Sequence, residues 1–100
     1  EYNNSMPGAL KNAIDWASRG GAKSPLNHKP AAMMGAAGRL GSVRAQMQLR
    51  TVLMNNRLQV VQSPEVFVPG GEAFTDGELT SERYIDQVRR LIAALVALVD

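Results

Sequence analysis

The sequence has no cysteine, one histidine and five aromatic residues among its 100 positions. The absence of cysteine excludes disulfides and thiolate metal sites, so we expect a cytoplasmic setting. The histidine, His28, lies in a loop-like segment rich in glycine, proline and asparagine, and we interpret it as solvated rather than catalytic. No nucleophile–base pair, carboxylate dyad or metal-ligand spacing is present. The sequence therefore predicts neither a metal centre nor a catalytic residue of its own.

Long hydrophobic runs are also missing. The longest, residues 91–99, is far too short to span a bilayer, and we find no signal-peptide pattern, so we expect no membrane partner. Basic residues are scattered singly and aromatic residues are few, which disfavours nucleic-acid binding. The charge is unevenly distributed along the sequence. Residues 1–57 contain eight Lys and Arg and two acidic residues, whereas residues 58–100 contain three Lys and Arg and seven acidic residues. This indicates either a solvated surface or a first half that faces an anionic ligand.

The chain can form one small domain, and its apolar fraction of 45% is typical of globular proteins. Its polar first eight residues lead into an amphipathic helix, with Ser5 as the predicted cap and Pro7 in the first turn. The apolar positions recur at helical spacing on one face: Leu10, Ala13, Ile14 and Ala17. The sequence thus predicts an irregular loop held on a helix.

A strand–turn–helix unit follows. Residues 29–35 form a short apolar run without alternation, which favours a strand covered on both faces in a parallel sheet. The glycine-rich loop 35–42 leads into a helix that ends near Asn56. This arrangement offers backbone amides to an anion, although tight strand-to-helix turns use glycine for other reasons as well. Residues 58–61 and 65–68 predict a last strand interrupted at Pro64, because proline lacks a backbone donor.

The two later helices differ in their apolar faces. The helix before Asn56 has two such faces, one formed by Ala45, Leu49, Val52 and Leu53 and the other by Val43, Met47 and Met54 with Arg50. The second face indicates a contact with another subunit or else a patch of surface methionines. After turn residues at 69–77, Thr80 is predicted to cap a final helix. We expect that helix to pack on the sheet through one broad face: Ile85, Val88, Leu91, Ile92, Leu95, Val96, Leu98 and Val99.

The first residues also carry a family resemblance. Glu1-Tyr2-Asn3, Ser5, Pro7-Gly8 and residues 10–16 resemble the signature of the NAD(P)H-dependent FMN reductases, which include chromate and quinone reductases. The resemblance continues through the strand at 29–35, the glycine loop, Arg44-Ala45-Gln46 with Leu49-Arg50, and Pro64-Glu65. It implies an α/β fold, a flavodoxin-like three-layer sandwich with a parallel sheet. Residues 1–100 would be the C-terminal part of one such domain, with its last two strands and three helices, and without the N-terminal strands and the FMN phosphate loop.

The resemblance implies a site and a reaction. Glu1, Tyr2 and Asn3 would lie along the isoalloxazine with Ser5 nearby, and Gly35 to Gly38 would border the same pocket. The cofactors would be FMN and NAD(P)H, and the acceptor a quinone, a free flavin, an azo compound or a metal oxyanion in a ping-pong cycle. The flavin would carry the chemistry. The alternatives are a non-enzymatic fragment or interaction module without flavin, and an electron carrier, although carriers are usually acidic.

The resemblance also implies partners. In tetrameric relatives an arginine at the place of Arg44 pairs with a glutamate after the next strand, here Glu65. Met47 and Arg50 would accompany this contact in a homodimer or tetramer, while Asn4 and Met47 replace tyrosines that accompany the pair in some relatives. We also expect the chain to need the missing N-terminal half, in the same protein or as a second chain, in order to hold FMN.

Overall fold

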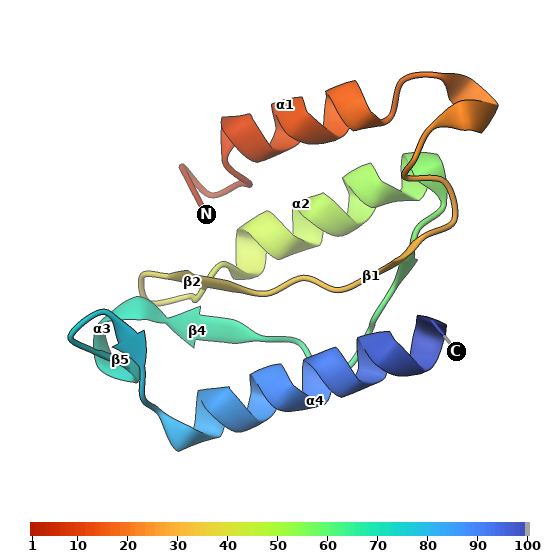
Figure 1. Cartoon of the computed structure of the whole chain (residues 1–100). Helices are drawn as coiled ribbons and strands as arrows, with labels where there is room; N and C mark the ends of the chain where they lie inside the picture. The colour runs from red at the N-terminus through yellow and green to blue at the C-terminus, as the bar shows by residue number, and fades with distance from the viewer. Residues whose placement is uncertain (100) are drawn as a thin grey trace.

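The computed structural model describes residues 1–99 and has parallel strand pairs at its centre. β1 (Pro30–Ala31) pairs with β3 (Gln59–Val60), and β2 (Gly35–Ala37) pairs with β4 (Phe67–Pro69). β1 and β2 follow one another along one path and β3 and β4 along another, so the short strands form one interrupted ribbon (Figure 1). The interruption includes Pro64, as the sequence predicts.

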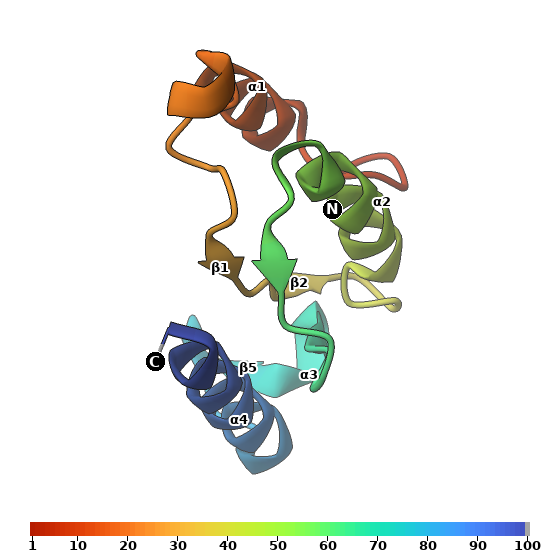
Figure 2. The same cartoon turned by 90° about the vertical axis from the view of Figure 1, so that its right-hand side faces the viewer.

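Helices cover both faces of this ribbon. α1 (Gly8–Ala17) and α2 (Val43–Leu53) lie on one side, and α4 (Glu82–Val99) lies on the other (Figures 1 and 2). Two 3₁₀ turns complete the connections, at Gly21–Lys23 after α1 and at Met54–Asn56 after α2. The helix–sheet–helix order is the three-layer α/β architecture that the family resemblance implies.

The hydrophobic core lies between the ribbon and α4. Its buried members are Val61, Val66, Val68, Ala73 and Leu91, and the half-buried side chains packed against them include Tyr84, Val88, Ala94 and Leu95 of α4. Val66 has no exposed surface at all. The apolar run of the last strand therefore does form a covered strand, although regular ladder pairing is limited to its two ends.

A small hairpin, which the sequence pattern does not predict, precedes α4. α3 (Gly70–Ala73) is a single helical turn, and β5 (Phe74–Thr75) and β6 (Glu78–Leu79) pair in antiparallel fashion. Asp76 and Gly77 connect them with φ angles of 50° and 82°. These values suit the two-residue hairpin turn for which Asp-Gly is a known signal. The sequence thus predicts turns here, but neither the hairpin nor a fourth helix.

Both predicted helix caps are wrong. Pro7 occupies the N-cap position of α1 without a side-chain cap, and the hydroxyl of Ser5 instead donates to Oε1 of Gln48. The Thr80 hydroxyl lies 2.8 Å from that of Thr75, across the hairpin, so it stabilises the turn before α4 rather than its first amides. In both places a tertiary partner captures the hydroxyl that local sequence would assign to a cap.

The apolar face of α4 is only partly covered within the chain. Leu91 is 3% exposed, whereas Ile92 and Val96, on the next strip of the helix surface, are 51% and 53% exposed. The prediction that the whole broad face packs on the sheet is therefore correct for one strip and wrong for its neighbour. The ribbon is two strands wide, and it covers only part of an apolar face this broad. None of the helices within residues 1–99 is both long and apolar enough to cross a bilayer.

Candidate functional site

The first five residues form a tight reverse turn. The N–H of Tyr2 donates to the carbonyl of Ser5 over 2.8 Å, and the N–H of Ser5 donates back over 3.1 Å. Asn3 and Asn4 lie between them with φ angles of 48° and 65°. Asparagine tolerates this left-handed conformation better than most residues, and the two positive angles are those of a type I′ turn. The Asn-Asn pair is a turn signal in the sequence, because both residues adopt positive φ readily.

Three side-chain hydrogen bonds fasten this turn to the first half of α2. A carboxylate oxygen of Glu1 accepts the backbone N–H of Ala45 over 2.9 Å. The guanidinium of Arg44 donates to the side-chain oxygen of Asn4 over 2.7 Å, and Ser5 donates to Gln48. The turn therefore reaches across 40 to 44 residues of sequence to hold one helix face.

The turn leaves particular groups available. Tyr2 uses both its backbone N–H and its carbonyl in the turn, but its side chain is 71% exposed. Within residues 1–99 the backbone amides of Asn3 and Asn4 make no hydrogen bond. An exposed aromatic face beside two adjacent free amides suits the edge of a flat, polar ring.

The two glycines predicted to line a pocket have different surroundings. A Cβ on Gly35 would lie 2.3 Å from Oγ of Ser42, so glycine is required there to let the loop close over β2. A Cβ on Gly38 would meet no atom within 4 Å. Gly38 therefore borders open space, whereas Gly35 is explained by packing.

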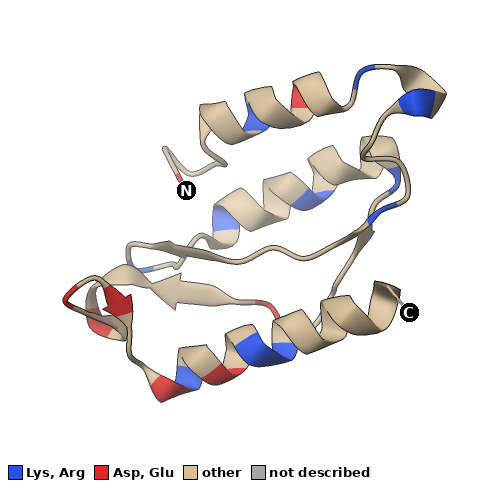
Figure 3. Cartoon of the chain, in the orientation of Figure 1, with Lys and Arg blue, Asp and Glu red and all other residues tan. Residues whose placement is uncertain are grey.

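The turn, the glycine loop and the α3–hairpin segment all lie toward the same end of the molecule (Figure 1). β2 and β4 both end there and α2 begins there, and Figure 1 shows the N-terminus near the start of α2, toward the end of the molecule where these strands finish. In open α/β sheets, ligands bind beyond this edge. Figure 3 shows acidic residues gathered on α3 and the hairpin at the same end, while Arg39 is the basic residue of the loop. The basic residue of the loop belongs to the basic first half of the chain, and these acids belong to the second half.

The residues predicted to form a subunit interface do not behave alike. Met47 and Arg44 are exposed on α2, and Met54 is 72% exposed. Arg50 instead points inward, and both terminal nitrogens of its guanidinium lie 3.3 Å from the carbonyl of Val61. Glu65 is exposed and forms no ion pair within residues 1–99.

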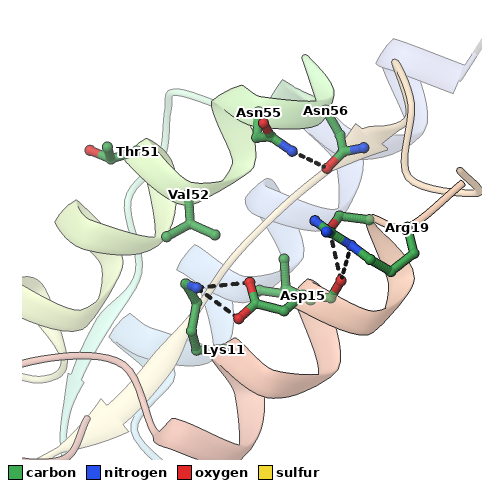
Figure 4. Close-up of a pocket in the computed structure, with 9 residues that line it drawn as sticks. Lys11, Asp15, Arg19, Thr51, Val52, Asn55 and Asn56 are labelled. Atoms are coloured by element: carbon green, nitrogen blue, oxygen red, sulfur yellow. Dashed lines mark hydrogen bonds and ion pairs between the residues drawn. The ribbon is translucent and has the colours of Figure 1, made fainter. Parts of the chain in front are cut away.

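A groove of about 300 Å³ runs between α1 and α2 (Figure 4). Its charged groups are already engaged: Lys11 and Asp15 form an ion pair at 2.7 Å, and Arg19 donates to the carbonyl of Asp15. Among residues 1–99, no three His, Cys, Asp or Glu side chains are placed to hold a metal ion. His28 is exposed, in agreement with its interpretation as a solvated loop residue.

Comparison with known proteins adds a family and a fold. A family model described as NADPH-dependent FMN reductase matches residues 1–73. An NAD(P)H-dependent FMN reductase of Pseudomonas aeruginosa is 42% identical over 98 residues, which are 95% of this chain and 52% of that protein. A 2-hydroxy-1,4-benzoquinone reductase of a Burkholderia species is 41% identical over 85 residues, covering 82% of this chain and 46% of the relative.

A solved structure is similar over almost the whole chain. The flavoenzyme FerB of Paracoccus denitrificans, an NAD(P)H:(acceptor) oxidoreductase, superposes with a TM-score of 0.82 at 34% sequence identity. The match covers 97% of this chain and 55% of that one. The predicted flavodoxin-like fold class is therefore confirmed. The chain spans about half the length of the relatives it matches.

Proposed function

The chain belongs to the NADPH-dependent FMN reductase family, and from this premise we propose that it forms the isoalloxazine side of the flavin pocket in an FMN-dependent NAD(P)H oxidoreductase. The observation that carries the proposal is that the Glu1–Ser5 turn and the loop around Gly38 both adjoin the start of α2, at the end of the molecule where β2 and β4 finish. That edge is where ligands bind in sheets of this class.

The groups present fit a flat heterocycle. The side chain of Tyr2 is free to lie along a ring, and the amides of Asn3 and Asn4 are free to donate to its polar edge. Gly38 leaves room for a ring to approach the backbone, whereas Gly35 allows the loop to pack closely against Ser42. Ser5 contributes by holding the turn on α2. The chemistry that FMN supplies when bound is acceptance of a hydride from NAD(P)H and its delivery to an acceptor, such as a quinone, a free flavin, an azo compound or a metal oxyanion.

The pocket needs a second contribution. β1 and β2 are paired on one side only, and Met34, Ile92 and Val96 expose apolar surface nearby. A two-stranded sheet is marginal by itself. We propose that the other half of the domain, in the same protein or as a second chain, pairs with the free edge and supplies the phosphate site.

An assembly of copies is a further part of the proposal. Arg44 and Glu65 are both exposed, and Glu65 has no ion pair within residues 1–99. In a homodimer or tetramer, Glu65 of one copy would approach Arg44 of the next, beside Met47. Because Arg50 bonds to Val61 of its own chain, its part would be to support α2 from within. Sedimentation velocity of the wild type and of Glu65→Arg tests the contact, since the charge reversal should shift the distribution to the smaller species.

The reaction can be tested directly by rapid mixing. Anaerobic NADH or NADPH, added to the FMN-loaded full-length protein, should bleach the flavin absorbance, and a quinone added afterwards should restore it. No bleaching by either nucleotide would reject the proposed reaction. A protein that takes up no FMN at all would favour the interaction-module alternative.

A separate titration tests the need for a second half. The 100-residue chain alone should show no micromolar affinity for FMN in calorimetry, whereas the protein that includes the other half should. Tight binding by the chain alone would contradict the division of the pocket.

A further inference from the structure

The start of α2 lacks a cap from its own sequence. Ser42 occupies the N-cap position, where serine is favoured, but its φ is 80° and it makes no capping hydrogen bond. Its hydroxyl oxygen instead accepts a hydrogen bond from Nε2 of the buried Gln46 over 3.0 Å. The first turn contains no acidic residue, and Arg44 brings a positive charge to the positive end of the helix dipole.

Glu1 supplies the missing cap from 44 positions away. Its carboxylate accepts the N–H of Ala45, which stands at the third position of the helix and is one of the amides without an intrahelical partner. A negative charge here also opposes the dipole and the charge of Arg44. The amide that the glycine loop offers to an anion is thus occupied by a carboxylate of this chain, which explains why Glu1 bends back while Tyr2 points outward.

We propose that Glu1 is a positioning residue: it fixes the Tyr2–Asn3 turn to the first turn of α2 and thereby to the glycine loop, and it does not itself contact the flavin. The inference rests on the proposed function for the identity of the ligand. Both pocket-forming segments adjoin α2, the glycine loop through the chain and the turn through Glu1, Asn4 and Ser5. The Glu1 bond is the one of the three that ends on the helix backbone, so it fixes distance as well as orientation.

The geometry sets different demands on each substitution. Glu1→Gln keeps an oxygen acceptor at the same reach and loses the charge. Glu1→Asp keeps the charge and shortens the side chain by one methylene, and Glu1→Ala removes both. Asp86→Asn is a matched control, because Asp86 is an exposed carboxylate on α4 whose partner is Arg90, far from α2 in sequence.

The experiment measures two quantities in the full-length protein. Hydrogen exchange of the Ala45 amide should accelerate about tenfold in Glu1→Ala, which is the scale of losing a helix cap, and stay within about threefold in Glu1→Gln. The Kd for FMN should rise about tenfold in Glu1→Ala and recover in parallel in Glu1→Gln, while Asp86→Asn changes neither. Glu1→Asp should resemble Glu1→Ala because it cannot reach.

The outcomes separate this inference from the proposed function. A higher Kd for FMN in Glu1→Ala with unchanged hydrogen exchange of the Ala45 amide would overturn the positioning role and indicate that Glu1 contacts FMN directly. Unchanged values of both would overturn the inference altogether. If Glu1→Ala does not fold, Glu1→Gln and Glu1→Asp still decide, because only the latter should move both quantities. A wild type that binds no FMN would reject the proposed function, and the exchange of Ala45 would then decide the anchoring by itself.

Discussion

Two amphipathic helices, α1 and α4, have similarly clear apolar stripes but are held in different ways. α4 places Leu91 in the core and packs Val88 and Leu95 against it. α1 buries no residue, and its Leu10 and Trp16 are 41% and 74% exposed. The apolar spacing therefore identifies the face of a helix that can be buried. Whether that face is buried depends on what the rest of the molecule packs against it.

α1 is held by hydrogen bonds at its two ends rather than by buried apolar side chains. At its beginning the Glu1–Ser5 turn is hydrogen-bonded to α2. At its end the buried hydroxyl of Ser24 donates to the carbonyl of Ala17 over 2.7 Å and accepts from the side chain of Asn56, in the 3₁₀ turn that follows α2. Hydrogen bonds at both ends thus link α1 to α2 and its following turn, and a groove lies between the two helices. Hydrogen bonds fix position, whereas buried apolar surface contributes most of the stability.

The largest expected effect tests this division on α4. Leu91→Ala in the 100-residue chain should lower the free energy of unfolding by about 3 kcal/mol, because it opens a cavity in the core. Ile92→Ala, the adjacent residue on the exposed strip, should cost less than about 1 kcal/mol. Urea unfolding followed by circular dichroism measures both. Equal losses would show that the two strips are not differently covered. With the other half of the domain present, we expect the cost of Ile92→Ala to rise toward that of Leu91→Ala.

A smaller effect tests the hydrogen bonds of Ser24, which link the end of α1 to Asn56. Ser24→Ala should lower the free energy of unfolding by about 1–2 kcal/mol, because it removes the bond to Ala17 and leaves the buried Asn56 amide with one partner fewer. Ser18→Ala is the control, since the Ser18 hydroxyl makes only local bonds: it donates to the carbonyl of Asp15 and accepts from the side chain of Arg19. The control should cost less than about 0.5 kcal/mol. A reversed order of the two would show that α1 does not depend on its link to α2.

The sequence predicts what is local in this molecule and fails where distant segments meet. Helical spacing locates α1, α2 and α4, and Pro64 locates the break in the last strand. The roles of Glu1 and Ser5 escape because their partners, Ala45 and Gln48, lie more than 40 positions away. The two turns could have been found, since Asn3-Asn4 and Asp76-Gly77 are residue pairs that adopt positive φ readily. Nothing in the spacing of α4 separates the strip of Leu91 from that of Ile92, because that difference depends on the width of the sheet.

The smallest expected effect is one in which the two helices should not differ. Each has an exposed i,i+4 ion pair, Lys11–Asp15 on α1 and Asp86–Arg90 on α4. Water screens both pairs, so Asp15→Asn and Asp86→Asn should each change the free energy of unfolding by less than about 0.5 kcal/mol, and 1 M salt should reduce even that. Urea unfolding at low and high salt measures this. A loss above 1 kcal/mol for Asp15→Asn alone would show that α1, lacking buried surface, depends on its surface charges, and the account of how Ser24 and the Glu1–Ser5 turn hold it would then be incomplete.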